Sequence, residues 1–288
     1  MDAFKRAYDY VKREGRPLDQ ARLAYAFEQG SKDAVLEALS HYQEADGGFS
    51  GLEPDFSADA STPIDTWMAI NIVRELDLPT DHNMTSRICD YLEQTSDQDA
   101  QGYYYFATLS MQKADHAPWW HTEKNRVEGF NPTASLVAFY HQHRGGTPKT
   151  HAIIQKAIEH IATQKQLEMH EWRALMEMVL TLPKATQQDL QPSLKRHLET
   201  FLPELERWRE TYTAGPVELF FHPQCLTWCD RPLPWPSLIQ SVKDNLHPKG
   251  YVPIRWQWEG ARFEEAQRHW HSLLTTQTLL WLNAFQGV

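Results

Sequence analysis

The sequence has few cysteines, no long apolar run and no excess of positive charge, and each shortage excludes a class of protein. The 288 residues include three cysteines, Cys89, Cys225 and Cys229. Such an odd and sparse set argues against a disulfide framework and favours a reducing compartment. No apolar run approaches the roughly 18 residues that suggest a membrane span, so we expect no stable membrane insertion.

Charge and composition narrow the classes further. Lysine and arginine number 28 against 38 aspartate and glutamate, a net charge of −10. This is the wrong sign for a protein that binds the phosphate backbone, so we expect no nucleic-acid partner. The segment 1–15 carries charges where a signal peptide needs an apolar stretch, which predicts a cytoplasmic protein. The 41% of hydrophobic residues is typical of a globular chain, and eleven tryptophans are an unusual count.

Helical periodicity dominates the chain, and the alternation typical of strands is short wherever it occurs. The clearest helix start is Ser61-Thr62-Pro63, a cap followed by a first-turn proline, with Asp65 near the positive helix end. Asn131-Pro132 predicts a second such start. The expected helices cover residues 1–14, 17–29, 31–43, 62–77, 82–95, 131–143, 149–164, 169–182, 187–202, 217–229, 235–246 and 262–285. The prediction is an all-α chain of about six helical hairpins in one domain over residues 1–288.

Three connections are long enough to hold a functional site. Residues 44–60, 100–130 and 247–261 are rich in glycine, proline, aromatic and acidic residues, and sites are often placed on long loops over a helical scaffold. Gly-aromatic pairs recur in them, at Gly48-Phe49, Gly102-Tyr103 and Gly250-Tyr251, which suggests degenerate repeats of one hairpin unit.

The segment Gln43–Phe49 reads Gln-Glu-Ala-Asp-Gly-Gly-Phe. It resembles the Gln-x-x-Asp-Gly-Gly-aromatic repeat of triterpene cyclases and the related prenyltransferase toroids. The combination of this motif with Leu52-Glu53-Pro54-Asp55, Ser61–Trp67 and Asn131-Pro132 resembles short bacterial proteins described as prenyltransferase-like or squalene cyclase-like. The resemblance implies an α/α toroid, in which inner helices surround a cavity and outer helices lie outside. In these families the motif ties helices together and performs no chemistry.

The catalytic motifs of this superfamily are missing from the chain. When Asp65 and Thr66 are laid on the last acid and the threonine of the cyclase Asp-x-Asp-Asp-Thr-Ala segment, the proton donor's position holds Pro63. Ionisation-initiated enzymes hold magnesium and diphosphate on an Asp-Asp-x-x-Asp cluster, and this sequence has no Asp-Asp pair. We therefore expect neither chemistry, and we predict no cofactor.

A zinc site is one reading of the segment that contains His222, Cys225 and Cys229. Imidazole and thiolate are zinc ligands, and these residues could share a helical face. The order does not reproduce the ligand set of protein prenyltransferases. The alternative is two buried free thiols, and we predict no bound metal.

Acidic residues gather before and inside the helix that starts near residue 62. Four of them, Glu53, Asp55, Asp59 and Asp65, lie within thirteen positions, and neighbouring carboxylates can divide acid and base roles. Asp55 and Asp65 are therefore catalytic candidates, and Glu53 is a substrate-binding candidate at the mouth of the cavity. The alternative is that Asp65 caps its helix and the others are solvated.

Aromatic residues supply the remaining candidates. His116 is the best acid or base candidate in the connections. Trp119 and Trp120 are candidates for binding an isoprenoid chain or a sugar ring, or for plugging a barrel end. Trp256 and Trp258 would line a wall if the run that contains them is extended, or would seal the last hairpin.

Three function classes follow from these residues. The first is a terpenoid cyclase-like or prenyltransferase-like protein that binds or converts an isoprenoid-like apolar small molecule. The second is a carbohydrate-active α/α-barrel enzyme, by analogy of fold alone. The third is a non-catalytic binding or scaffold protein. Catalysis, substrate identity and oligomeric state are left open.

Overall fold

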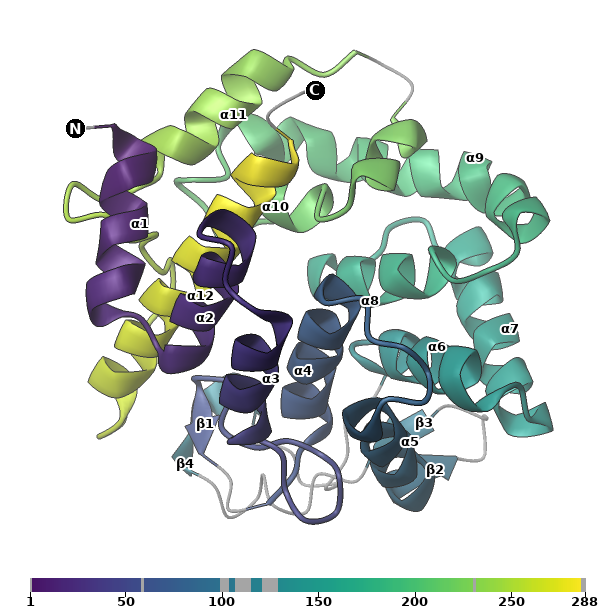
Figure 1. Ribbon diagram of the computed structural model, residues 1–288. Helices are drawn as coiled ribbons and strands as arrows, with labels where there is room; N and C mark the ends of the chain where they lie inside the picture. The colour runs from purple at the N-terminus through teal and green to yellow at the C-terminus, as the bar shows by residue number, and fades with distance from the viewer. Residues whose placement is uncertain are drawn as a thin grey trace. The chain divides into compact units, whose positions relative to one another are not determined.

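The computed structural model describes residues 2–57, 60–98, 104–106, 115–120, 129–229 and 232–285. Over these residues the chain is all-α, and its four strands are two or three residues long (Figure 1). It divides into two compact units. Unit 1 combines the chain up to His41 with the chain from Leu198 onward, and unit 2 is Tyr42–His197. One domain over 1–288 stays a prediction.

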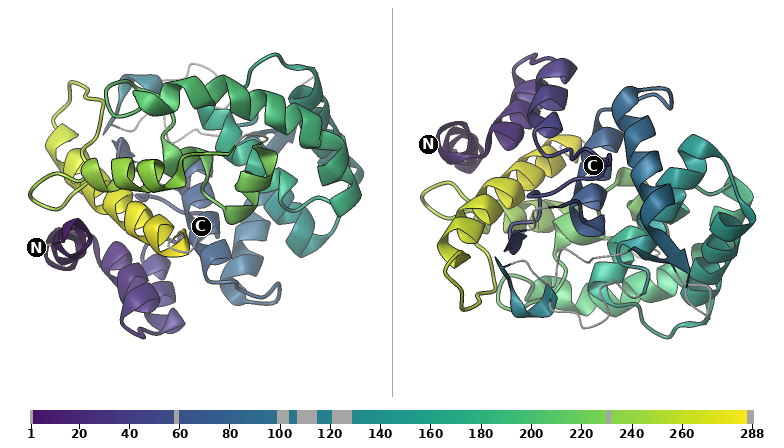
Figure 2. Two further views of the ribbon diagram at one scale, coloured as in Figure 1. Left: turned by 90° about the horizontal axis from the view of Figure 1, so that it is seen from above. Right: turned by 90° about the horizontal axis from the view of Figure 1, so that it is seen from below.

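Unit 1 is built around the longest helix of the described residues. Its elements are α1 (Ala3–Glu14), α2 (Pro17–Phe27), α3 (Lys32–Ser40), the 3-10 helix η2 (Leu202–Glu206), α10 (Pro216–Leu219), the 3-10 helix η3 (Pro223–Trp228), α11 (Trp235–Asp244) and α12 (Phe263–Ala284). Helices α1 and α2 both pack against α12, and Figure 2 shows them beside it. Buried apolar residues fill the space between them, namely Ala7, Val11, Leu23, Leu246, Val252 and Leu279.

Unit 2 is built around α6. Its elements are β1 (Phe56–Ser57), α4 (Pro63–Glu75), α5 (Asn83–Thr95), β2 (Ser96–Gln98), β3 (Tyr104–Phe106), β4 (Asp115–His116), the 3-10 helix η1 (Pro118–Trp120), α6 (Thr133–Arg144), α7 (Pro148–Thr163) and α8 (Met169–Val179). Helix α9 (Lys184–Phe201) crosses from unit 2 into unit 1. Helix α6 packs against α4, α5, α7 and α8, and every residue from Thr133 to Phe139 is buried. Strand β1 pairs antiparallel with β4, and β2 with β3.

Eleven of the expected helices lie within a few residues of an observed one, and the expected helix at 217–229 is wrong. That segment divides into α10 and η3, because Pro223 cannot donate the backbone hydrogen bond that would continue α10. Thr62 caps α4 as expected, since its hydroxyl accepts from the amide of Asp65. Asn131 does not cap α6, where Pro132 is the N-cap residue without a side-chain bond.

A tight turn precedes α4 in unit 2. The amide of Gly47 donates to the carbonyl of Glu44 (3.0 Å), and φ of Gly47 is +94°. A Cβ on Gly47 would lie 2.2 Å from the carbonyl oxygen of Arg87 on α5, so only glycine fits. The amide of Phe49 then donates to the hydroxyl of Thr66 on α4 (3.1 Å). The turn thus contacts both the helix that follows it and the next helix along the chain.

The same turn precedes α12 in unit 1. The amide of Gly250 donates to the carbonyl of His247 (2.8 Å), and φ of Gly250 is +98°. A Cβ on Gly250 would lie 2.3 Å from the carbonyl oxygen of Arg6 on α1. The amide of Val252 donates to the hydroxyl of Thr275 on α12 (2.8 Å). Helix α12 therefore corresponds to α4, and α1 corresponds to α5.

Helices α1 and α5 also share a sequence pattern. Arg6–Val11 reads Arg-Ala-Tyr-Asp-Tyr-Val, and Arg87–Leu92 reads Arg-Ile-Cys-Asp-Tyr-Leu. The structure matches Gly250 to Gly47, one residue away from the register that the Gly-aromatic pairs suggested. The third pair, Gly102-Tyr103, lies outside the described residues. A repeat of one helical unit is therefore present at two places in the chain.

Candidate functional site

Asp65 ties the connection before α4 to the start of that helix. Its side chain is fully buried. Oδ1 accepts from the backbone amides of Leu52 and Glu53, each at 2.7 Å, and Oδ2 accepts from the hydroxyl of Thr62 at 2.5 Å. Three donors converge on the carboxylate, and such charge-assisted bonds are stronger than neutral ones. Asp65 therefore positions the loop that carries the other acidic candidates.

Glu53 and Asp55 are buried, with exposed fractions of 5% and 2%. The expectation that they are solvated is therefore wrong, because the loop folds back onto unit 2. Oε1 of Glu53 accepts from the amide of Asp55 (3.2 Å). The carbonyl of Asp55 accepts from the amide of Ala117 (2.7 Å). The backbone on both sides of this acidic pair is thus fixed by hydrogen bonds.

The strand pair β1–β4 brings His116 to the same place. His116 lies opposite Phe56 in the antiparallel register. Phe56 is the residue that follows Asp55 in the chain. Helix η1 follows directly and carries both tryptophan candidates. Trp119 is 49% exposed, an unusual value for so large an apolar side chain, and Trp120 is partly buried. The structure therefore gathers the six candidates of unit 2 on two adjoining segments, 52–65 and 115–120.

Trp256 and Trp258 lie in unit 1, on the connection that leads into α12. The run that contains them is not a regular strand. Trp256 packs edge-on against Trp270, with ring centroids 5.1 Å apart. Trp258 is buried against Phe263, at 5.8 Å. The contacts of both side chains fit the sealing role weighed above, and a wall for a ligand stays a prediction.

A polar network on α4, α6 and α8 was missed in the sequence. Its centre is Glu177, whose side chain is 5% exposed. Oε2 accepts from the indole of Trp67 (2.7 Å), the hydroxyl of Ser135 (2.6 Å) and the guanidinium of Arg74 (3.3 Å). Oε1 accepts from the guanidinium of Arg173 (2.8 Å). A single carboxylate thereby joins three helices of unit 2.

The two arginines set the charge of this network. Burial raises the pKa of Glu177, but the guanidinium groups of Arg173 and Arg74 outweigh it, so the pKa of Glu177 lies below its usual value. Arg173 lies over the ring of Trp67, with its guanidinium carbon 5.7 Å from the centroid. Arg74 is 25% and Arg173 28% exposed, so both cations keep contact with solvent. The Arg173-Glu177 spacing of four was visible in the sequence, but the partners on α4 and α6 depend on helix packing.

The residues of the zinc hypothesis, His222, Cys225 and Cys229, lie in η3 and directly beside it. Cys225 is buried, Cys229 is partly buried, and Nδ1 of His222 accepts from the amide of Gln224 (3.2 Å). Among the residues that the structure describes, no group of three or more His, Cys, Asp or Glu side chains could hold a metal ion. Within the same residues, no helix combines the length and the apolar character that crossing a membrane requires.

Comparison with known proteins found no match to any family model, curated protein or solved structure. The repeated turn, the adjoining segments 52–65 and 115–120, and the network around Glu177 are therefore the observations from which a function can be argued.

Proposed function

We propose that the chain is an α/α toroid of the terpenoid cyclase and prenyltransferase type, and that it binds an isoprenoid-like apolar ligand. One observation carries the proposal, the turn that recurs before α4 and before α12 with the same glycine, threonine and outer-helix contacts. In unit 2 the outer helix α5 follows α4 along the chain. In unit 1 the corresponding outer helix is α1, at the opposite end of the sequence. This arrangement is compatible with a ring of hairpins in which the first helix of the chain completes the last hairpin.

The ligand class is supported by the aromatic residues beside the acidic loop. Trp119 lies on η1, directly after β4, and exposes about half of a large apolar side chain. The free energy of the system falls when an apolar molecule covers such a surface. The resemblance of Gln43–Phe49 to the toroid repeat points to the same class of ligand.

Binding is a better assignment than proton-initiated cyclisation. Pro63 stands where such a cyclase needs its acid. The carboxylate of Asp65 is occupied by three hydrogen bonds, from the amides of Leu52 and Glu53 and from the hydroxyl of Thr62, which hold the loop before α4 in place. We therefore assign Asp65 a positioning role, and His116 is the residue best suited to proton transfer if the ligand is converted.

A thermal-shift panel tests the proposal. Metal-stripped protein is heated with farnesol, farnesyl diphosphate, a hexasaccharide or a divalent metal, because a ligand of the native state raises the unfolding midpoint. We expect a shift with farnesol and a much smaller one in Trp119→Ala. The control is Tyr212→Ala, which removes an aromatic side chain of similar exposure, 54%, in unit 1. No shift with either isoprenoid contradicts the proposal.

A carbohydrate-active enzyme is the second candidate, since the buried pair Glu53 and Asp55 adjoins an exposed tryptophan. Glycosidases combine two carboxylates with aromatic stacking surfaces. A shift with the hexasaccharide alone selects this candidate. If no compound of the panel shifts the unfolding midpoint, the result favours a scaffold protein without a small ligand.

A further inference from the structure

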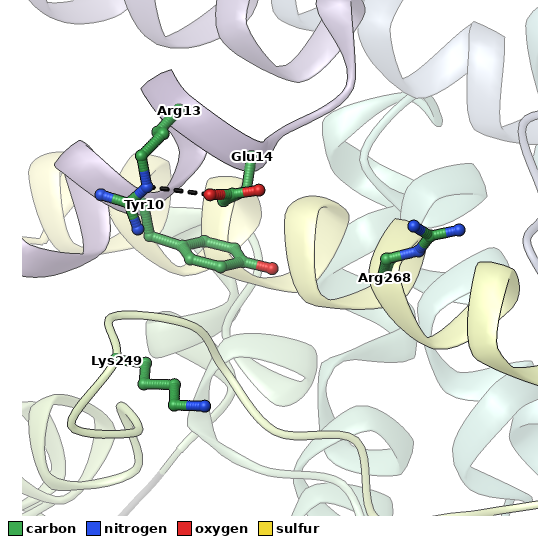
Figure 3. Close-up of a pocket in the computed structure, with 5 residues that line it drawn as sticks. All are labelled: Tyr10, Arg13, Glu14, Lys249 and Arg268. Carbon is green, nitrogen blue, oxygen red and sulfur yellow. Dashed lines mark hydrogen bonds and ion pairs between the residues drawn. The ribbon is translucent and has the colours of Figure 1, made fainter.

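The polar side chains of the pocket beside α1 in unit 1 point to different places. Its volume is about 370 Å³. It is lined by Tyr10, Arg13, Glu14, Lys249 and Arg268 (Figure 3). Glu14 pairs with Nε of Arg13 at 2.9 Å, and Figure 3 shows the guanidinium of Arg268 directed away from Lys249. These groups are not arranged to bind one ion together, whereas two imidazoles of unit 2 are.

His141 and His151 lie together at the corner between α6 and α7. His141 belongs to the last turn of α6, and His151 follows the capped start of α7. Their ring centroids are 5.1 Å apart, and the ring planes are inclined by 62°. The two histidines are ten positions apart in the sequence, a spacing that matches no common metal-ligand motif. Only the packing of α6 against α7 brings them together.

Gly146, between the two helices, leaves room for both rings. A Cβ on Gly146 would lie 2.2 Å from Nε2 and 2.6 Å from Cε1 of His151, and 2.7 Å from Cε1 of His141. Both rings therefore direct the edge that carries Cε1 to the same place. In an imidazole ring Cε1 stands between the two nitrogens, so the edges that converge here are the ones that carry ligand atoms.

The imidazole of His141 is in the state that binds a metal ion. Its Nδ1, which adjoins Cε1, is buried and has no hydrogen-bond partner among the residues described. Burial, with the nearby His151, lowers the pKa of His141. The ring is therefore neutral at pH 7, as a metal ligand must be. His151 is exposed, so ions in solution reach the pair from its side.

We propose that His141 and His151 bind a zinc ion through one nitrogen of each ring. Two imidazoles that bind one tetrahedral ion, at about 2.0 Å from each nitrogen, have ring centres about 5 Å apart. The observed separation of 5.1 Å fits this geometry. Adjacent ligands of a square-planar ion such as copper would lie closer, with ring centres about 4.5 Å apart.

Two positions of the tetrahedron stay open to water or to a small ligand. The site therefore differs from a closed structural zinc site, which has four protein ligands. A pair of ligands is also compatible with the finding that no group of three or more metal-binding side chains occurs among the described residues. The inference stands apart from the proposed function, since it uses neither the isoprenoid ligand nor the tryptophans.

Isothermal titration of the full chain with Zn²⁺ tests the site. We expect His141→Ala and His151→Ala each to weaken Zn²⁺ binding at least about tenfold, because each removes one of the two protein ligands. Mg²⁺, which takes oxygen ligands, should not bind there. His170→Ala is the matched control, because it removes a histidine of unit 2 that is 51% exposed and lies on α8. That variant should bind Zn²⁺ as the unaltered chain does.

Proton NMR locates the ion independently of its affinity. The signals of the Cε1 protons of His141 and His151, assigned from the two variants, should shift together when Zn²⁺ is added, and that of His170 should not. Unfolding midpoints of the metal-free variants verify that each one folds. The inference is overturned if Zn²⁺ does not bind, if either variant binds it as tightly as the unaltered chain, or if His170→Ala weakens binding as much. Trp119→Ala should leave Zn²⁺ binding unchanged, so this inference and the proposed function can fail separately.

Discussion

The connection that follows the turn is held to its helix by polar contacts in unit 2 and by aromatic packing in unit 1. In unit 2 the carboxylate of Asp65 binds the backbone amides of Leu52 and Glu53. In unit 1 the residue that corresponds to Asp65 is Leu274. No acidic residue occurs within two residues of Leu274 in the sequence. There the connection packs through Trp256 and Trp258.

The difference separates what the turn needs from what it can vary. Both copies keep a glycine with positive φ and a threonine hydroxyl that accepts a backbone amide. The side chains around the turn differ, and so do the chemical properties of its surroundings. One copy supports a buried acidic loop, and the other borders a pocket lined by residues of α1, the turn and α12.

The largest expected effects are at the two shared glycines. Gly47→Ala and Gly250→Ala each place a Cβ within 2.3 Å of a backbone oxygen, at positive φ. The backbone strain at positive φ and the steric overlap of the new Cβ add together. We therefore expect each substitution to lower the free energy of unfolding by about 4 kcal/mol. Gly145→Ala is the control, because its φ is +84° but no atom lies within 4 Å of the added Cβ. Urea unfolding should show about half the loss there, and equal losses in all three would break the comparison.

Asp65→Ala tests the feature that only unit 2 has. It leaves the buried amides of Leu52 and Glu53 without their acceptor, so we expect a loss of about 3 kcal/mol in the free energy of unfolding. Asp33→Ala removes an exposed first-turn carboxylate from α3 and should cost less than about 1 kcal/mol. Similar losses from both would show that Asp65 acts only on the helix dipole.

Thr66→Val and Thr275→Val test the shared hydroxyl. Each leaves one amide, that of Phe49 or Val252, without its acceptor, and we expect each to cost about 2 kcal/mol by thermal unfolding. Thr276→Val is the control, since its buried hydroxyl has no hydrogen-bond partner among the residues described. That variant should leave the stability unchanged or raise it. If Thr66→Val lowered the stability and Thr275→Val did not, the correspondence of the two turns would be contradicted.

The smallest effect is a pH dependence confined to unit 1. Burial, with the nearby His247, lowers the pKa of His271 to about 4, from its usual value of about 6.5. At pH values between about 4 and 6.5, His271 is therefore protonated in the unfolded chain and neutral in the folded one. The free energy of unfolding consequently decreases as the pH falls from about 6.5 toward about 4. His271→Phe keeps a ring beside Tyr251 and should reduce the slope of the unfolding midpoint in this interval. An unchanged slope would contradict this assignment.

The sequence predicted most of the helices because their starts are local signals. Thr62 and Pro63 mark the start of α4 without reference to any other part of the chain. The helix expected at 217–229 is interrupted before Pro223, although the apolar periodicity continues through the segment. Local signals therefore decide the helix boundaries.

The sites were less predictable because they depend on residues far apart in the chain. The acidic loop and His116 could be named from the sequence, but the burial of Glu53 and Asp55 and the pairing of β1 with β4 beside them could not. The pocket beside α1 leaves no pattern in the sequence, since Tyr10 and Lys249 line it together only when α1 packs beside a turn about 240 residues later. Spacing patterns carry no signal for such contacts.

Amide hydrogen exchange at Phe49 and Val252 tests the central claim, that one turn occurs twice with the same hydrogen bonds. We expect both amides to exchange slowly in the native protein. Thr66→Val should release only the amide of Phe49, and Thr275→Val only that of Val252. Rapid exchange of Val252 in the unaltered chain would contradict the account.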